Sequence, residues 1–160
     1  MALVATIGAA TADTYATLAE YTARAAAMGW TLADTDAANE VNLRRAAVAI
    51  DATYQFIGYQ QYKAQALDWP RLWTGLVDGW PVDPDTIPQA VKQAQMEMAY
   101  LIQGGADPLA TFTGAIKREK VDVIEVEYTG GAGRPRFDAV DRLLRNFVAV
   151  YPGQGRMVRA

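Results

Sequence analysis

Apolar residues recur at helical spacing in four separate stretches of this 160-residue chain. The first stretch follows Thr17 and Glu20, whose types and spacing match a capping box, so a helix is expected to begin directly after Thr17. Gly29 is its expected end. The apolar stripe of this helix comprises Leu18, Tyr21, Ala25 and Met28.

The second stretch follows "TLADTDAANE", in which Asp34, Thr35 or Asp36 can cap a helix. Arg44, Arg45 and Asp51 are interpreted as its solvated face. The opposite face carries an apolar stripe of Leu43, Ala46, Ala47, Ile50 and Tyr54.

The third helix is expected to start near Pro88, with Thr86 and Gln89 as a second capping box, and to end at Gly104 and Gly105. Its buried stripe is predicted to be Val91, Ala94, Met98, Leu101 and Ile102. The last amphipathic helix is marked by Val140, Leu143, Leu144, Phe147 and Val148.

Residues 55–85 lose this period and collect prolines and tryptophans, which predicts a long ordered loop with at most a short helical turn. Its tryptophans, Trp69, Trp73 and Trp80, are interpreted as core and interface anchors in preference to platforms for base stacking.

"AIKREKVDVIEVEY", residues 115–128, has the alternation of extended chain. Ala115, Lys117, Glu119 and Val121 would share one face, whereas Ile124, Val126 and Tyr128 would share a face in the other phase. Because the apolar phase slips between these two runs, two strands joined by a turn near Asp122 and Val123 are predicted. A two-stranded hairpin is marginal alone, so it needs a neighbour.

The amino-acid composition excludes several kinds of catalytic, disulfide and metal site. The chain has no cysteine and no histidine, which excludes disulfides, Ser-His-Asp triads and ordinary zinc sites. We expect no catalysis, no cofactor and no metal. The N-terminus lacks the pattern of a secretory signal and no apolar run is long enough to span a bilayer, so a cytoplasmic product is expected and no membrane contact is expected.

Charge is divided unevenly along the chain. Residues 1–116 hold 6 Lys/Arg against 12 Asp/Glu, whereas residues 117–160 hold 9 against 6. Arg134, Arg136, Arg142 and Arg145 could therefore face either nucleic acid or an acidic protein surface. The acidic pairs Asp83/Asp85 and Glu125/Glu127 lack a third ligand and are interpreted as solvated. "TGGAG" lacks a Walker ending and is interpreted as a flexible connector.

Four segments, in order, resemble those of tailed-phage head–tail connector (adaptor) proteins. They are "LRRAAVAIDATY" (43–54), "QALDWPR" (65–71) with "DGWPVDPDTIPQAVKQAQMEMA" (78–99), "KREKVDVIEVEY" (117–128) and "RPRFDAVDRLL" (134–144). Relatives often carry glycine and proline where this chain has Asp122 and Val123. The same sequence group is also labelled as DnaT-like single-stranded-DNA-binding proteins, so the resemblance leaves two functions open.

The resemblance to connectors implies a mainly α fold: a four-helix adaptor core at about 14–110 and 137–149, a protruding β-hairpin at about 115–128 and an extended tail at 150–160, in one domain. It implies a homo-oligomeric ring, commonly twelve-fold, in the neck of the virion between the portal protein and a head-completion or tail protein, with packaged DNA as a further contact. The alternative is a DnaT-like replication protein that binds single-stranded DNA.

If the connector reading is right, the contacts are expected in the hairpin, the following loop and the tail, because a hairpin can add to a neighbouring strand and such segments can order on binding. The residues expected to contact portal or neighbouring copies are Lys117, Arg118, Lys120, Ile124, Val126, Tyr128, Arg134, Arg136, Arg156 and Arg159.

Overall fold

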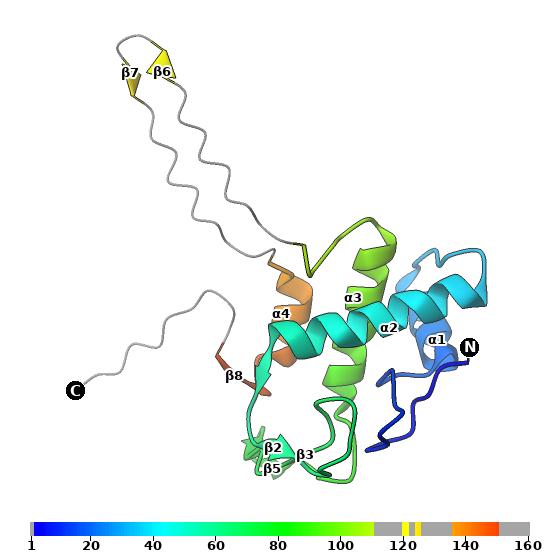
Figure 1. Ribbon diagram of the computed structural model, residues 1–160, viewed down its shortest axis with the longest axis vertical. Coiled ribbons are helices and arrows are strands. Elements are labelled where there is room, and N and C mark those ends of the chain that lie inside the picture. Colours follow the sequence, from blue (N-terminus) through cyan, green and yellow to red (C-terminus); the bar gives the residue numbers. More distant parts are fainter. Residues whose placement is uncertain (1, 111–119, 122–123, 126–135, 151–160) are drawn as a thin grey trace.

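Four helices form the body of the protein. The computed structural model describes residues 2–110, 120–121, 124–125 and 136–150. The helices are α1 (Leu18–Met28), α2 (Asp36–Thr53), α3 (Gln89–Gln103) and α4 (Asp138–Leu144). α3 packs against both α2 and α4, and α1 packs against α2 (Figure 1). The expected mainly α class agrees with these helices in part, because short strand pairs accompany them.

The first two helices begin where the sequence predicts. Thr17 and Glu20 form the expected capping box, and Gly29 closes α1 with a φ of 70°. Of the three candidate caps for α2, the Thr35 side chain is the one that accepts a hydrogen bond, from the amide of Ala38. Met28 was expected in the buried stripe of α1 but is exposed, since it lies in the last turn.

The third helix starts differently from the prediction. Pro88 is the residue before the first turn of α3 and no side chain caps the helix. Thr86 does not form a capping box with Gln89, because its hydroxyl donates to the carbonyl of Asp83 instead (3.2 Å). The helix ends at Gly104 and Gly105 as predicted.

The segment expected to be an irregular loop carries five short strands. It contains β1 (Gln55–Phe56), β2 (Tyr59–Gln60), β3 (Arg71–Leu72), β4 (Leu76–Val77) and β5 (Trp80–Pro81). β2 pairs with β3 and β4 pairs with β5, both antiparallel. In Figure 1 these two pairs lie together at one end of the molecule, beyond the end of α2.

The last helix is shorter than predicted. α4 ends at Leu144, and the following residues form β8 (Val148–Val150), which pairs antiparallel with β1. The apolar residues Phe147 and Val148 are buried as the pattern predicted, but Phe147 lies in a turn and Val148 begins a strand, which suits its β-branched side chain. This pairing joins the C-terminal part of the body to the residues that leave α2.

β6 (Lys120–Val121) and β7 (Ile124–Glu125) pair antiparallel, with Val121 opposite Ile124. This pairing places two residues between the strands at the predicted turn, and Figure 1 shows the pair apart from the four helices. The remaining residues of the predicted hairpin, and the tail after Val150, lie outside the described residues.

The mainly apolar core surrounds one fully bonded amide, that of Gln95. The predicted stripes of α2 and α3 are buried, with Leu101 only partly so. Within this core, the Gln95 side chain accepts from the amides of Tyr15 (3.0 Å) and Ala16 (2.8 Å) and donates to the Thr14 hydroxyl (2.7 Å) and the Leu43 carbonyl (2.8 Å). It thereby attaches the N-terminal segment to α2 and α3. No helix among the described residues is long and apolar enough to cross a bilayer.

Candidate interaction surface

Arg71 holds the aromatic loop, residues 55–85, in place. Its guanidinium donates to four backbone carbonyls, those of Phe56 (3.3 Å), Ile57 (2.9 Å), Gly58 (2.6 Å) and Asp68 (3.1 Å). Arg71 is buried, and so many bonds to one cation compensate for its desolvation. This arginine therefore fixes β1, the turn before β2 and the start of β3 relative to one another.

Gly58 allows the backbone to approach closely beside Arg71. Its φ is 73°, and a Cβ there would lie 2.0 Å from the carbonyl oxygen of Leu72. A residue with a side chain would therefore be both strained and in collision with backbone. The β2–β3 pair can form only with glycine at this position.

A buried polar cluster attaches the same loop to α2. The Tyr15 hydroxyl donates to the Asp51 carboxylate, and the amide of Asp68 lies 3.1 Å from both groups. Asp51 was predicted to lie on a solvated face; that prediction was wrong, because the loop folds over this side of α2. The side chain thus joins the N-terminal segment, α2 and the loop.

Removal from water raises the pKa of Asp51 to about 7, although the bonds from Tyr15 and from the Asp68 amide oppose the shift. Burial and the neighbouring Asp51 raise the pKa of the Tyr15 hydroxyl well above its ordinary value, so it stays a donor at neutral pH. The cluster is therefore sensitive to pH near neutrality.

Beyond this anchored part, the loop turns outward. The exposed fractions of the large side chains on β2 to β5 are 79% for Trp73, 76% for Trp80, 69% for Leu76 and 59% for Tyr59. We call these four residues the aromatic surface. By contrast, Trp69 is 1% exposed and lies edge-on to Phe56 and Phe147.

A tight turn presents the outer part of this surface. Asp78 and Gly79, both with positive φ (53° and 86°), connect β4 to β5, which is the backbone pattern of a type I′ hairpin. Asp-Gly between two apolar runs is a strong hairpin signal that the sequence interpretation overlooked. Recognising it would have placed Leu76 and Trp80 on a short, exposed hairpin.

The charges around the aromatic surface are acidic. Residues 55–85 contain Asp68, Asp78, Asp83 and Asp85 against Lys63 and Arg71, and Arg71 is committed to the loop itself. Elsewhere in the described residues, Arg24, Arg44 and Lys92 form ion pairs with carboxylates. The ion pairs are Arg24–Glu97, Arg44–Asp13, Arg44–Glu40, Arg71–Asp68 and Lys92–Glu20.

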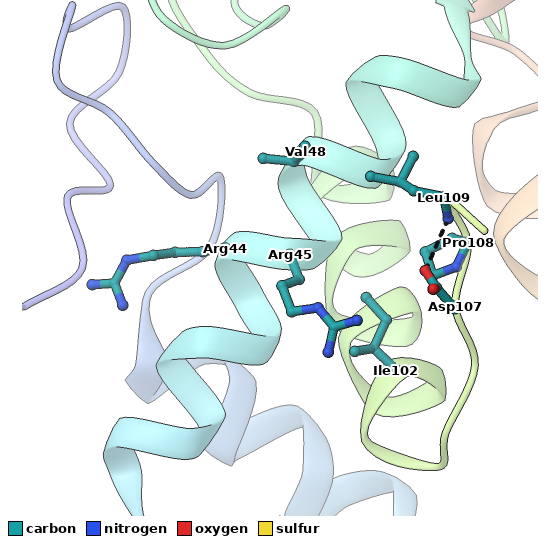
Figure 2. A pocket seen from close by; sticks show the side chains of 7 residues that line it. All are labelled: Arg44, Arg45, Val48, Ile102, Asp107, Pro108 and Leu109. Atoms are coloured by element: carbon teal, nitrogen blue, oxygen red, sulfur yellow. Dashed lines mark hydrogen bonds between the residues drawn. The ribbon is translucent and has the colours of Figure 1, made fainter. Parts of the chain in front are cut away.

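A second feature is an open, mainly apolar pocket of about 220 Å³ between α2 and the residues that follow α3. Figure 2 shows Arg44 extending away from it, whereas Arg45 reaches across toward Ile102. The only polar bond drawn there joins the Leu109 amide to the Asp107 carboxylate (3.3 Å). The pocket offers no set of converging polar groups. It is lined by Arg44, Arg45, Val48, Ile102, Asp107, Pro108 and Leu109.

The structure describes some of the residues that the sequence marked as candidate metal ligands or contact residues. Asp83 accepts from the amide of Asp85, and Asp85 accepts from the Gln61 side chain (2.6 Å), so this pair organises the loop. In the part of the chain that the structure describes, no three His, Cys, Asp or Glu side chains come together as a metal site. Arg136 is exposed, and its role as a contact residue stays a prediction.

The other predicted contact residues are outside what the structure describes, wholly or in their side chains. For Lys120 and Ile124 the structure describes the backbone, in β6 and β7. Nothing in the structure tests their role or that of Lys117, Arg118, Val126, Tyr128, Arg134, Arg156 and Arg159.

The fold and the surface define a small, mainly helical protein that exposes an aromatic surface at one end. The chain belongs to the family described as "Putative DnaT-like ssDNA binding protein", whose model matches residues 1–160. No curated protein and no solved structure matches the chain. The family description agrees with the alternative of the two expected functions, and these comparisons give no support to membership of a phage head–tail adaptor family specifically.

Proposed function

We propose that this protein is a structural, non-catalytic component of a tailed-phage neck, which forms an oligomeric ring and joins the portal protein to a head-completion or tail protein. The assignment to the neck rests on the sequence resemblance to connectors. The observation that favours a protein partner over DNA is the aromatic surface with acidic residues around it.

Protein interfaces and single-stranded DNA both use exposed tryptophan, but they differ in charge. DNA affinity that is independent of sequence comes largely from cations that neutralise the phosphates. A surface on which bases stack therefore also carries lysines or arginines along the path of the DNA backbone. Here Asp78 forms the tip of the hairpin beside Trp80, and Lys63 is the one cation of residues 55–85 that is exposed. Such a surface repels phosphate and suits a protein partner.

Native mass spectrometry of the full chain, alone and with the portal protein, tests this function. We expect rings, or rings that form once portal is added. A chain that is monomeric alone and stays monomeric and unbound when portal protein is added would contradict the proposal.

The second candidate function is single-stranded-DNA binding, which the family description favours. Trp73 and Trp80 would then stack on bases, and the basic residues after position 116 would contact phosphates. A fluorescence titration with oligo(dT) of about 30 nucleotides, at two salt concentrations, separates the candidates. Quenching that disappears steeply with salt supports DNA binding, and no quenching at low salt supports the neck protein.

A further inference from the structure

The aromatic surface is largely exposed, yet its backbone is held in place. Arg71 and Gly58 fix β2 and β3, and the Asp78-Gly79 turn fixes β4 and β5. Exposed aromatic side chains on a fixed backbone lose little conformational entropy on binding, which is the usual property of interface anchors.

Trp73 adds a second indication that this surface is a contact site. Its φ is 59°, in the left-handed region, where a bulky residue is a genuine outlier and glycine is favoured. The side chain is 79% exposed, so packing within the chain does not compensate for this conformation. Strained residues of this kind concentrate at binding sites.

A complementary surface lies on α4 of the same chain. Val140 and Leu144 are buried toward the core, whereas Arg142 and Arg145 are exposed on the outer face. Arg136, just before α4, is exposed as well, and Asp138 is the acidic residue that shares this face. We call Arg136, Arg142 and Arg145 the arginine face.

We propose that the aromatic surface of one copy docks on the arginine face of a second copy. Guanidinium groups stack on exposed indole rings, and Trp73 and Trp80 provide two such rings. Asp78 at the tip of the β4–β5 hairpin provides a carboxylate for a cation at the edge of the contact.

This contact joins two different surfaces of one chain, so it is heterologous. A heterologous contact repeats from copy to copy and closes into a ring when the rotation allows it. The inference therefore rests on the proposed function and names the part of each copy that forms the ring. It also differs from the sequence prediction, which concentrated the assembly contacts in residues 115–136 and the tail.

Two interface variants of the full chain test the pairing. Trp73→Gly with Trp80→Ala removes the aromatic surface, and Trp73→Gly also relieves the strained backbone, so this variant is expected to stay folded. Arg142→Glu with Arg145→Glu reverses the arginine face. Circular dichroism and urea unfolding establish that each variant folds, and Lys63→Ala serves as an exposed control.

Each variant alone should associate at least about thirty-fold more weakly than wild type, as expected for interface anchors. An equimolar mixture should form dimers and nothing larger, because each variant retains the surface that the other lacks. Sedimentation velocity and native mass spectrometry report these states.

Rings from either variant alone would overturn this pairing while leaving the neck function intact. A mixture that stays monomeric although wild type forms rings would also overturn it. A wild-type chain that forms no ring, with or without portal, would overturn the proposed function itself. Quenching by oligo(dT) that the Trp73→Gly/Trp80→Ala variant loses would instead assign the surface to DNA.

Discussion

Two consecutive segments of the aromatic loop, which we call its inner half (residues 65–72) and its outer half (residues 73–81), have similar compositions and opposite environments. Residues 65–72 and residues 73–81 each carry tryptophan, proline and an aspartate. In the first half Trp69 is buried between Phe56 and Phe147, and in the second half Trp73 and Trp80 are exposed.

The difference comes from the polar residues that accompany each tryptophan. Around Trp69, Gln65 donates to the carbonyls of Leu67 (2.7 Å) and Pro70 (3.1 Å), and Arg71 binds four more carbonyls, so the backbone can be buried with its polar groups bonded. Within residues 73–81, β4 and β5 pair with each other across a tight turn, while Trp73, Leu76 and Trp80 stay exposed. The first half therefore builds the fold, and the second half is available for contact.

The largest expected difference in stability comes from a matched pair of tryptophan truncations, one in each half of the loop. Trp69→Ala should lower the free energy of unfolding by about 4 kcal/mol, because it leaves a large cavity in the core. Trp80→Ala should change it by less than about 0.5 kcal/mol, because the side chain is already exposed. Urea unfolding followed by circular dichroism measures both, and equal losses would contradict the division of the loop.

The second test removes the cation that anchors the inner half. Arg71→Ala leaves carbonyls at Phe56, Ile57, Gly58 and Asp68 without their donor and should cost about 3 kcal/mol in unfolding free energy. Lys63→Ala, an exposed cation of the same loop, is the control and should be neutral within about 0.5 kcal/mol. A neutral Arg71→Ala would mean that the loop does not depend on this side chain.

Two glycines with similar backbone conformations give the third test. Gly58→Ala should destabilise by more than about 2 kcal/mol, since its Cβ would collide with the Leu72 carbonyl as well as straining the backbone. Gly75 has a φ of 79° but nothing near the Cβ position, so Gly75→Ala should cost only about 1 kcal/mol. If the two changes cost the same in a thermal or urea unfolding series, the close approach at Gly58 would be wrong.

The last test concerns Asp51 and pH. Because its pKa in the folded protein, about 7, is above its ordinary value of 3.8, the folded form binds this proton more tightly than the unfolded chain. The stability that this group contributes is therefore complete below pH 4 and is lost as pH rises toward 7 and above. Asp51→Asn removes the titration, so the stability of the variant relative to wild type should improve between pH 5 and pH 8.

Urea unfolding at several pH values measures the difference in unfolding free energy between wild type and Asp51→Asn. Taking this difference cancels the contributions of groups that titrate in the same way in both proteins. Asp83→Asn, on the exposed part of the loop, is the matched control. A constant difference for Asp51→Asn would contradict a buried, pH-sensitive carboxyl at this position.

Helical periodicity predicted much of the body and little of the loop. Thr17, Gly29 and the stripes of α2 and α3 followed from local rules, because a helix satisfies its backbone within one segment. The strands β1 and β8 could not be predicted in the same way, since Phe56 and Val148 pair across most of the chain. Asp51 looked solvated because nothing local indicates that Asp68 folds over it.

The candidate surface could be predicted only in part. The Asp78-Gly79 turn was visible in the sequence, and it marks an exposed hairpin. Which tryptophan is buried was not visible, since that depends on the bonds made by Gln65 and Arg71. The resemblance segments 43–54 and 65–71 turn out to contain many of the residues that hold the fold, including Leu43, Asp51 and Arg71.

The central claim is that the outer half of the loop binds a protein. Native mass spectrometry of wild type and of the folded Trp73→Gly/Trp80→Ala variant, recorded in the presence of the portal protein with and without oligo(dT), tests it most directly. We predict rings for wild type, monomers for the variant and no bound oligonucleotide in either. Monomeric wild type carrying oligonucleotide that the variant fails to bind would contradict the claim and assign the surface to single-stranded DNA.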